Sequence, residues 1–309
     1  MIPVNPEEVS LSTGPGGDLT APDIWATAID SWLASRDPRA TAESVKAAQA
    51  IVASSGRRTD TPVRKAFVRS DDDAAPPMAK LYAGGRSGTV AIKLYLALIW
   101  RCAQAPFQTA KPTRAWATLL DLPDPGGKGA RRISAAMKTL EQHRLILSEP
   151  MAGQPSVVTL FDEGGQGRPY SLPSSSHSRA LHRRQSKGLI ASHVYFKVAS
   201  RLWLDGYFQQ LRGPGLTMLL ILLAEQGGEG KDVWFSTSVF HQRYRISHQT
   251  RATGTAELVK NGLLRIERQS VARDQKSDVF DPRRMRNIYK LQSPALVLPA
   301  SQARETALS

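Results

Sequence analysis

The sequence has a single cysteine, Cys102, among its 309 residues. One thiol cannot build a disulfide framework, and it also excludes a Cys-rich zinc site. Because Cys102 ends the apolar run LYLALIWRC, we expect it to be a buried core thiol.

Long hydrophobic runs are also missing. The longest, Leu216 to Ala224, is about half of the length that a transmembrane helix needs. The first ten residues, MIPVNPEEVS, lack the basic and apolar segments of a secretory signal peptide. We therefore expect a cytoplasmic protein that does not contact a membrane.

Acidic residues are scarce relative to basic ones, and the net charge is +14. The imbalance is uneven, because residues 179–292 have 20 Lys and Arg against 9 Asp and Glu, whereas residues 1–79 have a net charge of −3. A positive field of this size favours binding to a polyanion, since each phosphate contact releases condensed counterions. A highly charged solvated surface is the alternative.

Composition and periodicity divide the chain into seven segments. We expect a disordered region at 1–22, a helical pair at 23–55, a charged linker at 56–79, a first globular unit at 80–174, a basic connector at 175–193, a second unit at 194–292 and a tail at 293–309. The helical pair is too small for a core of its own. It is therefore expected to dock on the main body or on a second subunit.

Each globular unit has the same predicted order of elements, three helices followed by a two-stranded ribbon. In the second unit the third helix and the first ribbon strand read ISHQTRATGTAELVKNGLL (246–264), and in the first unit they read GARRISAAMKTLEQHRLIL (129–147). Leu140 aligns with Leu258 at an offset of 118, and Trp116 in the preceding helix aligns with Phe240 at an offset of 124. The difference of six matches the extra loop before the first copy, so we interpret the two units as a repeat.

This order resembles the winged helix-turn-helix family of DNA-binding proteins, over residues 80–174 and 194–292. The pattern common in the third helix of that family is matched by Ser247, Thr250, Leu258, Gly262, Leu263 and Leu264, whereas Arg251, Thr253 and Thr255 depart from it. The resemblance implies a mainly α fold with small β wings (α+β), two winged-helix domains and a short N-terminal helical region. It also implies that the third helix enters the DNA major groove.

In the second unit, Ser247 is expected to cap the helix and Gly262 to allow a left-handed turn. Thr255, Leu258 and Val259 are the expected packed stripe. The residues left for DNA contact are Ser247, His248, Gln249, Thr250, Arg251 and Thr253. Among these, Gln249 suits adenine and Arg251 suits guanine. The alternative is a solvated helix that packs against another protein.

In the first unit, Ile133, Met137 and Leu140 are the expected core positions. The residues left for DNA or solvent are Arg131, Arg132, Ser134 and Lys138. Arg144 occupies the position that Gly262 has in the second copy, which predicts a weaker helix end.

The two predicted wings differ in charge. The second wing has the basic residues Arg273, Lys276, Arg283, Arg284 and Arg286, which suit phosphate or minor-groove contacts. The first wing has only Arg168. In the connector, Arg179, Arg183, Arg184 and Lys187 could follow the DNA backbone. The sequence thus predicts that the second unit reads base sequence, while the first contacts backbone or pairs subunits.

No catalytic, metal or cofactor motif is apparent. The segment GGEGKD lacks the first glycine and the Ser or Thr of a phosphate-binding loop, and the six histidines are scattered. We predict a nucleoid-associated, non-enzymatic protein that binds double-stranded DNA, with homodimerisation through residues 23–55 or the first unit as an option. The expected role is transcription regulation, with a plasmid replication initiator or a winged-helix protein-interaction module as alternatives.

Overall fold

Helices and short antiparallel strands alternate in the computed structural model, which describes residues 39–57, 59–70, 74–226, 232–270 and 285–297. The fold is mixed α+β, 53% helical, with antiparallel sheets of only two or three strands, which confirms the expected excess of helix. No helix within the described ranges is both long and apolar enough to cross a membrane.

The first globular unit consists of three helices and a three-stranded sheet. Its elements are α4 (Gly85–Arg101), β2 (Gln108–Thr109), α5 (Thr113–Leu119), α6 (Lys128–Gln142), β3 (Ile146–Met151) and β4 (Gln154–Leu160). The strand order is β2-β4-β3, so the strand between the first two helices pairs with the returning strand of the ribbon. The predicted helices and ribbon are confirmed. The sequence does not predict β2, because two residues are too few to show an alternating pattern.

The second unit repeats this order. Its elements are α11 (Gly213–Gln226), α12 (Thr237–Tyr244), α13 (His248–Lys260), β6 (Leu264–Ser270) and β7 (Met285–Leu291). Val233, which precedes α12, forms an isolated antiparallel bridge to Tyr289 of β7. This bridge occupies the position that β2 has in the first unit.

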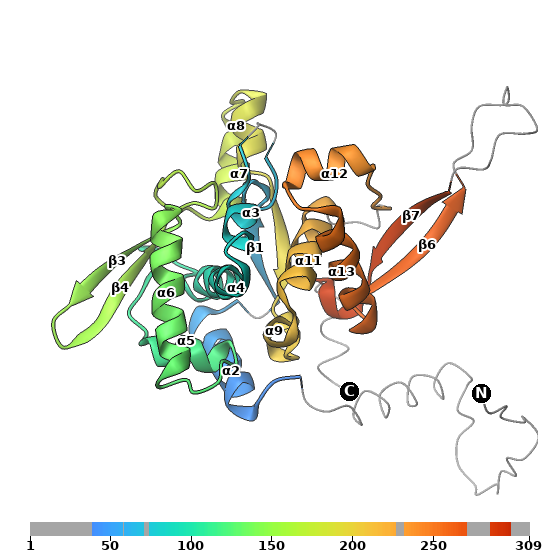
Figure 1. Ribbon diagram of the computed structural model, residues 1–309. Coiled ribbons are helices and arrows are strands. Elements are labelled where there is room, and N and C mark those ends of the chain that lie inside the picture. The colour runs from blue at the N-terminus through green and yellow to red at the C-terminus, as the bar shows by residue number, and fades with distance from the viewer. Residues whose placement is uncertain (1–38, 58, 71–73, 227–231, 271–284, 298–309) are drawn as a thin grey trace, which may run out of the picture. The chain divides into compact units, whose positions relative to one another are not determined.

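The first helices of the two units pack against each other (Figure 1). Every residue of α4 from Val90 to Trp100 is buried, because the first unit covers one side of the helix and α11 covers another. Lys93 lies within this run, and its ammonium donates to the carbonyl of Gln209 at 3.0 Å. Trp100 stacks on Trp203 with 5.8 Å between ring centroids. A helix that is buried on all sides over this run therefore joins the two units.

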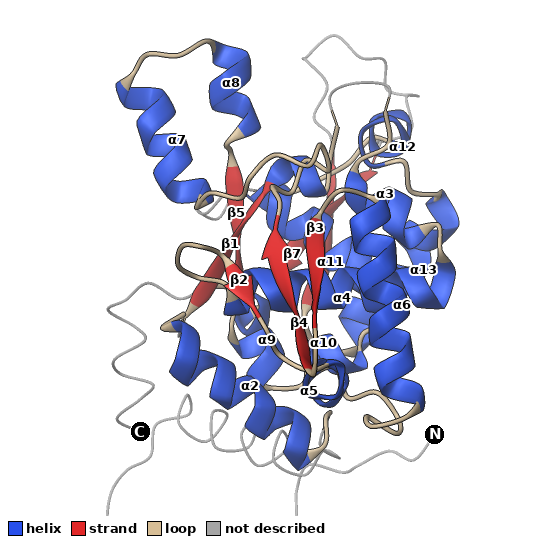
Figure 2. Ribbon diagram, turned by 90° about the vertical axis from the view of Figure 1, so that its left-hand side faces the viewer, coloured by secondary structure: helices blue, strands red, loops and turns tan. Residues whose placement is uncertain are grey.

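One strand of a two-stranded sheet lies in the segment that the sequence predicts to be a linker. Strand β1 (Asp60–Arg64) pairs antiparallel with β5 (Tyr195–Ala199), and β1 is visible beside β5 in Figure 2. The guanidinium of Arg64 forms a buried ion pair with Glu163, in the loop after β4. The expectation of a charged linker over residues 56–79 is therefore wrong for residues 60–67, which form β1 and the turn of helix that follows it. The partner strand lies about 130 residues away, and no local pattern reports such a pairing.

The second helix of the predicted N-terminal pair is confirmed as α2 (Ala42–Ser55). The Thr41 hydroxyl caps it, and Gly56 ends it with a φ of 69°. The hydroxyl of buried Ser44 donates to the carbonyl of Leu119 at 2.8 Å, so α2 docks on the first unit rather than standing apart. The predicted first helix of the pair lies outside the described residues.

The predicted basic connector consists mostly of helix. Helices α7 (Pro173–His182) and α8 (Lys187–Ser192) contact each other and form a helical hairpin (Figure 2). The sequence predicts a loop over 162–178, but Pro173 occupies the first turn of α7, where its missing N–H costs nothing. The remaining elements are η1 (Lys65–Phe67), α3 (Pro77–Tyr82), α9 (Arg201–Leu204), α10 (Tyr207–Gln210) and η2 (Ser293–Ala295).

Candidate nucleic-acid interface

Helix α6 has a buried apolar side and an exposed polar side, as its sequence predicts. Ile133, Met137 and Leu140 are buried, and α6 packs on α4 and α5. The predicted contact residues Arg131, Arg132, Ser134 and Lys138 are all exposed. The structure therefore brings three cationic side chains together on the solvent side of one helix.

The turn before α6 fixes where this helix begins. The Asp124 carboxylate accepts hydrogen bonds from the amides of Gly127 and Lys128, at 3.1 and 2.8 Å. A negative carboxylate at a helix N-terminus satisfies unpaired amides and interacts favourably with the helix dipole. Gly129 follows directly, and a Cβ there would lie 2.9 Å from the carbonyl of Asp124. The loop thus determines the rotation of α6 on the core.

Helix α13 is held close to α11 by a glycine and a glutamate. A Cβ on Gly254 would lie 2.3 Å from the carbonyl oxygen of Pro214, so the two backbones approach more closely than any side chain allows. The Glu257 carboxylate accepts from the amides of Arg212 and Gly215, at 2.7 and 3.1 Å, and so caps the start of α11. Leu258 is fully buried.

This packing corrects the predicted rotation of α13. The sequence predicts a packed stripe of Thr255, Leu258 and Val259, but Val259 is 45% exposed and Gly254 is buried. The predicted cap and end are confirmed: the Ser247 hydroxyl accepts from the Thr250 amide at 3.1 Å, and Gly262 has a φ of 69°.

The predicted contact residues of α13 divide into two groups. Ser247, His248, Gln249 and Thr253 are exposed. Thr250 is half-buried, and its hydroxyl lies 3.3 Å from the hydroxyl of Tyr82, at the end of α3. Thr250 therefore links α13 to the first unit and does not belong to the exposed side of the helix.

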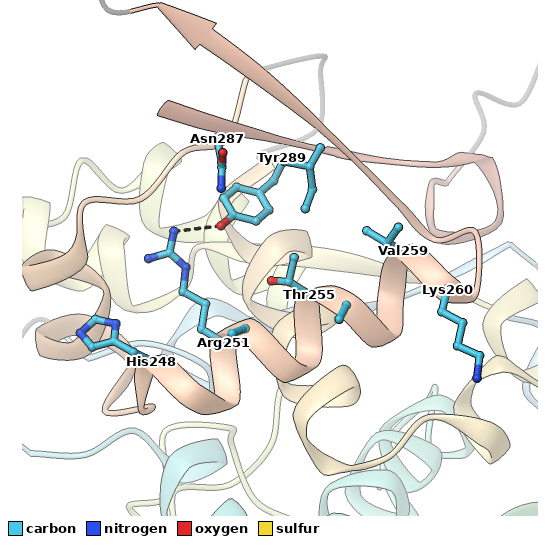
Figure 3. Close-up of a pocket in the computed structure, with 10 residues that line it drawn as sticks. His248, Arg251, Thr255, Val259, Lys260, Asn287 and Tyr289 are labelled. Atoms are coloured by element: carbon cyan, nitrogen blue, oxygen red, sulfur yellow. Dashed lines mark hydrogen bonds between the residues drawn. The ribbon is translucent and has the colours of Figure 1, made fainter. Parts of the chain in front are cut away.

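The side chain of Arg251 points at Tyr289 of β7 rather than into solvent (Figure 3). Its guanidinium donates to the Tyr289 hydroxyl at 2.9 Å. It also lies 4.8 Å from the ring centroid of Phe240, 5.4 Å from that of Phe235 and 5.6 Å from that of Tyr289. Cation–π attraction and a charged hydrogen bond thus hold Arg251 between α13 and β7.

A groove of about 700 Å³ separates α13 from the β6–β7 ribbon (Figure 3). Its lining combines small or apolar side chains with a few polar ones, and consists of His248, Arg251, Ala252, Thr255, Ala256, Val259, Lys260, Ile266, Asn287 and Tyr289. Sequence reasoning missed Asn287 and Tyr289. Both residues are in β7, and they meet α13 only after the ribbon folds back on the helix, so no local sequence pattern indicates them.

The predicted basic wing is described only in part. Arg273, Lys276, Arg283 and Arg284 lie outside the described residues. The guanidinium of Arg286 lies over the indole of Trp234 at 4.3 Å, and that indole is 49% exposed. An exposed aromatic ring and a cation therefore adjoin at the start of β7.

The predicted connector cations lie on and between α7 and α8. Arg179, Arg183, Arg184 and Lys187 are all exposed. Leu181 and Leu189, on the same hairpin, are also exposed. The hairpin thus presents cationic and apolar side chains together.

No metal site is evident in the described ranges. Among those residues, no group of three or more His, Cys, Asp or Glu side chains is arranged to hold a metal ion. Burial raises the pKa of the Cys102 thiol to about 12, so this thiol is a core group and not a nucleophile near neutral pH.

Comparison of the chain with models of protein families, with curated proteins and with solved structures found no match.

Proposed function

We propose that this chain binds double-stranded DNA through two winged-helix heads, one in each globular unit. The first unit has the order helix, strand, helix, helix and two-stranded ribbon, and the second unit has the same order with the single bridge of Val233 in place of the strand. This similarity supports the winged-helix assignment. In such a head the third helix enters the major groove and the ribbon contacts the backbone or the minor groove.

The observation that carries the proposal is the exposed side of α6. Arg131, Arg132 and Lys138 are exposed there. In the alignment of the two units, α6 is the helix that corresponds to α13. A solvated helix in an ordinary globular protein mixes charges of both signs, whereas this side of α6 is cationic. Together with a net charge of +14, it favours a phosphate-rich partner over a protein surface.

The two heads have unequal tasks in this proposal. The long cationic side chains of α6 contact phosphates, which carry no base sequence. In α13, His248, Gln249 and Thr253 are exposed and read base edges, with Gln249 suited to adenine. Arg251, held by Tyr289, sets the position of the wing relative to α13.

The proposed biological role is transcription regulation. Genomic fragments that the purified protein retains, once sequenced, test this role. Sites that overlap promoters support a regulator. Direct repeats beside an A·T-rich region would instead assign the chain to replication initiation.

Variants of α6 test the DNA-binding proposal itself. In Arg131→Gln/Arg132→Gln/Lys138→Gln, we expect affinity for any duplex to fall and the salt slope to become shallower by about 0.9 for each phosphate that the variant no longer binds. Lys46→Gln, on the exposed side of α2, is the matched control and should bind as the wild type does. Equal affinity of the triple variant and the control, measured by fluorescence anisotropy, would contradict the proposal.

A further inference from the structure

A small basic pocket lies at the end of α6, away from the groove described above. It has a volume of about 190 Å³, and its lining consists of Pro77, Lys80, Gln142, His143, Arg144 and Gly165. Three elements contribute to it: the helix α3, the end of α6 and the loop that follows β4. Residues far apart in the sequence therefore converge on one small space.

The side chains that line this pocket have a net positive charge. No carboxylate is in its lining, and neither Lys80 nor Arg144 forms an ion pair within the described part of the chain. Burial, together with the nearby charge of Lys80, lowers the pKa of His143. The imidazole thus senses a positive potential, which an anion in the pocket would neutralise.

The backbone fixes the geometry of the pocket. Arg144 has a φ of 53°, in the left-handed region, and this turn directs the chain away from α6. A Cβ on Gly165 would lie 3.0 Å from Pro77 and 3.2 Å from the carbonyl of His143, so the loop packs tightly against both. A Cβ on Gly167 would lie 3.6 Å from the Cβ and the Cδ of Arg144. The loop after β4 therefore packs against the backbone and the stem of Arg144.

The size of the pocket limits its occupant. Pockets for drug-sized ligands have volumes of about 300–1,000 Å³, and this one is smaller. Lysine and arginine side chains with a neighbouring amide are the usual donors to a phosphate group. We propose that this pocket binds one phosphate group, either a phosphodiester of DNA or a free phosphate.

Its position suits a phosphodiester of a bound duplex. Gln142 lies one helical turn beyond Lys138, so the pocket continues the exposed side of α6. From Arg131 to Gln142 the helix rises about 16 Å, which separates the pocket from the part of α6 that would enter a major groove. This choice of source rests on the proposed function, whereas binding of a phosphate group does not.

Titration with inorganic phosphate tests the site directly. NMR signals of the His143 imidazole, assigned with His143→Gln, are followed at constant ionic strength for the wild type, Lys80→Gln/Arg144→Gln and the control Lys46→Gln. We expect saturable shifts in the wild type and the control, and an affinity at least about tenfold weaker in the double variant, because both charged donors are absent. Lys80 and Arg144 are exposed, so the double variant should fold, and circular dichroism checks this.

A second arm identifies the source of the phosphate. The salt slope of duplex binding is measured for the same three proteins, and a decrease of about 0.9 in the double variant alone assigns the pocket to one DNA phosphodiester. An unchanged slope with saturable phosphate binding assigns it to a free phosphate. If His143 responds alike in all three proteins and their slopes are equal, the pocket proposal is overturned. If no protein binds any duplex, the proposed function fails, while the phosphate titration still decides the pocket.

Discussion

Replacing Arg251 distinguishes two roles for this side chain. The sequence favours a base-reading arginine, because Arg251 is near the start of the third helix of its unit. In the structure its guanidinium donates to Tyr289 at 2.9 Å and lies within 5.6 Å of three aromatic ring centroids. We therefore expect Arg251→Ala to loosen the wing from α13.

The size of the effect follows from these contacts. A hydrogen bond to a charged group contributes about 1.5–3 kcal/mol, and a cation–π contact about 0.5–1 kcal/mol where it is partly exposed. Because Arg251 is half-exposed, we take the lower values and expect Arg251→Ala to lower the free energy of unfolding by about 2–3 kcal/mol. Tyr289→Phe removes only the hydroxyl and its hydrogen bond to the guanidinium, so its expected cost is about 1.5 kcal/mol.

Thermal unfolding and duplex binding together test this reasoning. We expect Arg251→Ala to lower Tm by about 5–10 °C. In Arg251→Ala/Tyr289→Phe, the second substitution should lower Tm by almost nothing more, because the partner of the Tyr289 hydroxyl is already absent. Binding should weaken alike on all duplex sequences. An unchanged Tm, together with loss of preference at a single G·C pair, would refute the anchoring role and restore the base-reading one.

Two further predictions concern stability. Burial lowers the pKa of Lys93 from 10.5 to about 8, so between these values the unfolded chain holds a proton that the folded chain has released, and stability rises with pH. We expect Lys93→Met to raise the free energy of unfolding, measured with urea, most strongly below pH 8. The difference from the wild type should shrink by about 3 kcal/mol by pH 10.5. A difference that does not change with pH would contradict this. Gly254→Ala should destabilise by about 1–3 kcal/mol, because its Cβ would lie 2.3 Å from the Pro214 carbonyl, although helix propensity alone predicts a gain of about 1 kcal/mol. The control is Ala256→Gly, on the exposed side of α13, which should lower the free energy of unfolding by about 1 kcal/mol. If Gly254→Ala instead stabilised the protein, the close crossing of α11 and α13 would be disproved.

Local chemistry accounts for what the sequence predicts correctly. Ser247 caps α13 because a hydroxyl before an apolar-periodic segment can accept an amide hydrogen of the first turn. Gly262 and Arg144 both adopt the left-handed conformation at the ends of equivalent helices, although only glycine does so without strain. The repeat therefore preserves backbone geometry even where the residue type differs.

Close backbone approach explains the error in the rotation of α13. Counting apolar side chains places Val259 inside, because valine is apolar and glycine contributes no side chain. The crossing with α11 instead uses Gly254, where the absent Cβ lets the helices touch, and this turns Val259 toward solvent. A pattern of hydrophobic residues does not register contacts made by the backbone itself.

Long-range pairing explains the other omissions. Strand β1 contains Pro62 and charged residues, and it is a strand only because β5 pairs with it. The ion pair between Arg64 and Glu163 likewise joins residues about 100 positions apart. The basic pocket at the end of α6 was also not predictable, since Lys80, Arg144 and Gly165 meet only after folding.

The salt dependence of duplex binding tests the central claim most directly. Fluorescence anisotropy with a random-sequence duplex needs no knowledge of the target, because phosphate contacts are independent of sequence. If the two heads together make six or more phosphate contacts, the logarithm of the affinity should fall with the logarithm of the salt concentration with a slope of about −5 or steeper. About six phosphate contacts would lower the affinity clearly between 50 and 200 mM salt. The account is contradicted if the affinity does not change over this range, or if the protein does not bind the duplex at the lower salt concentration.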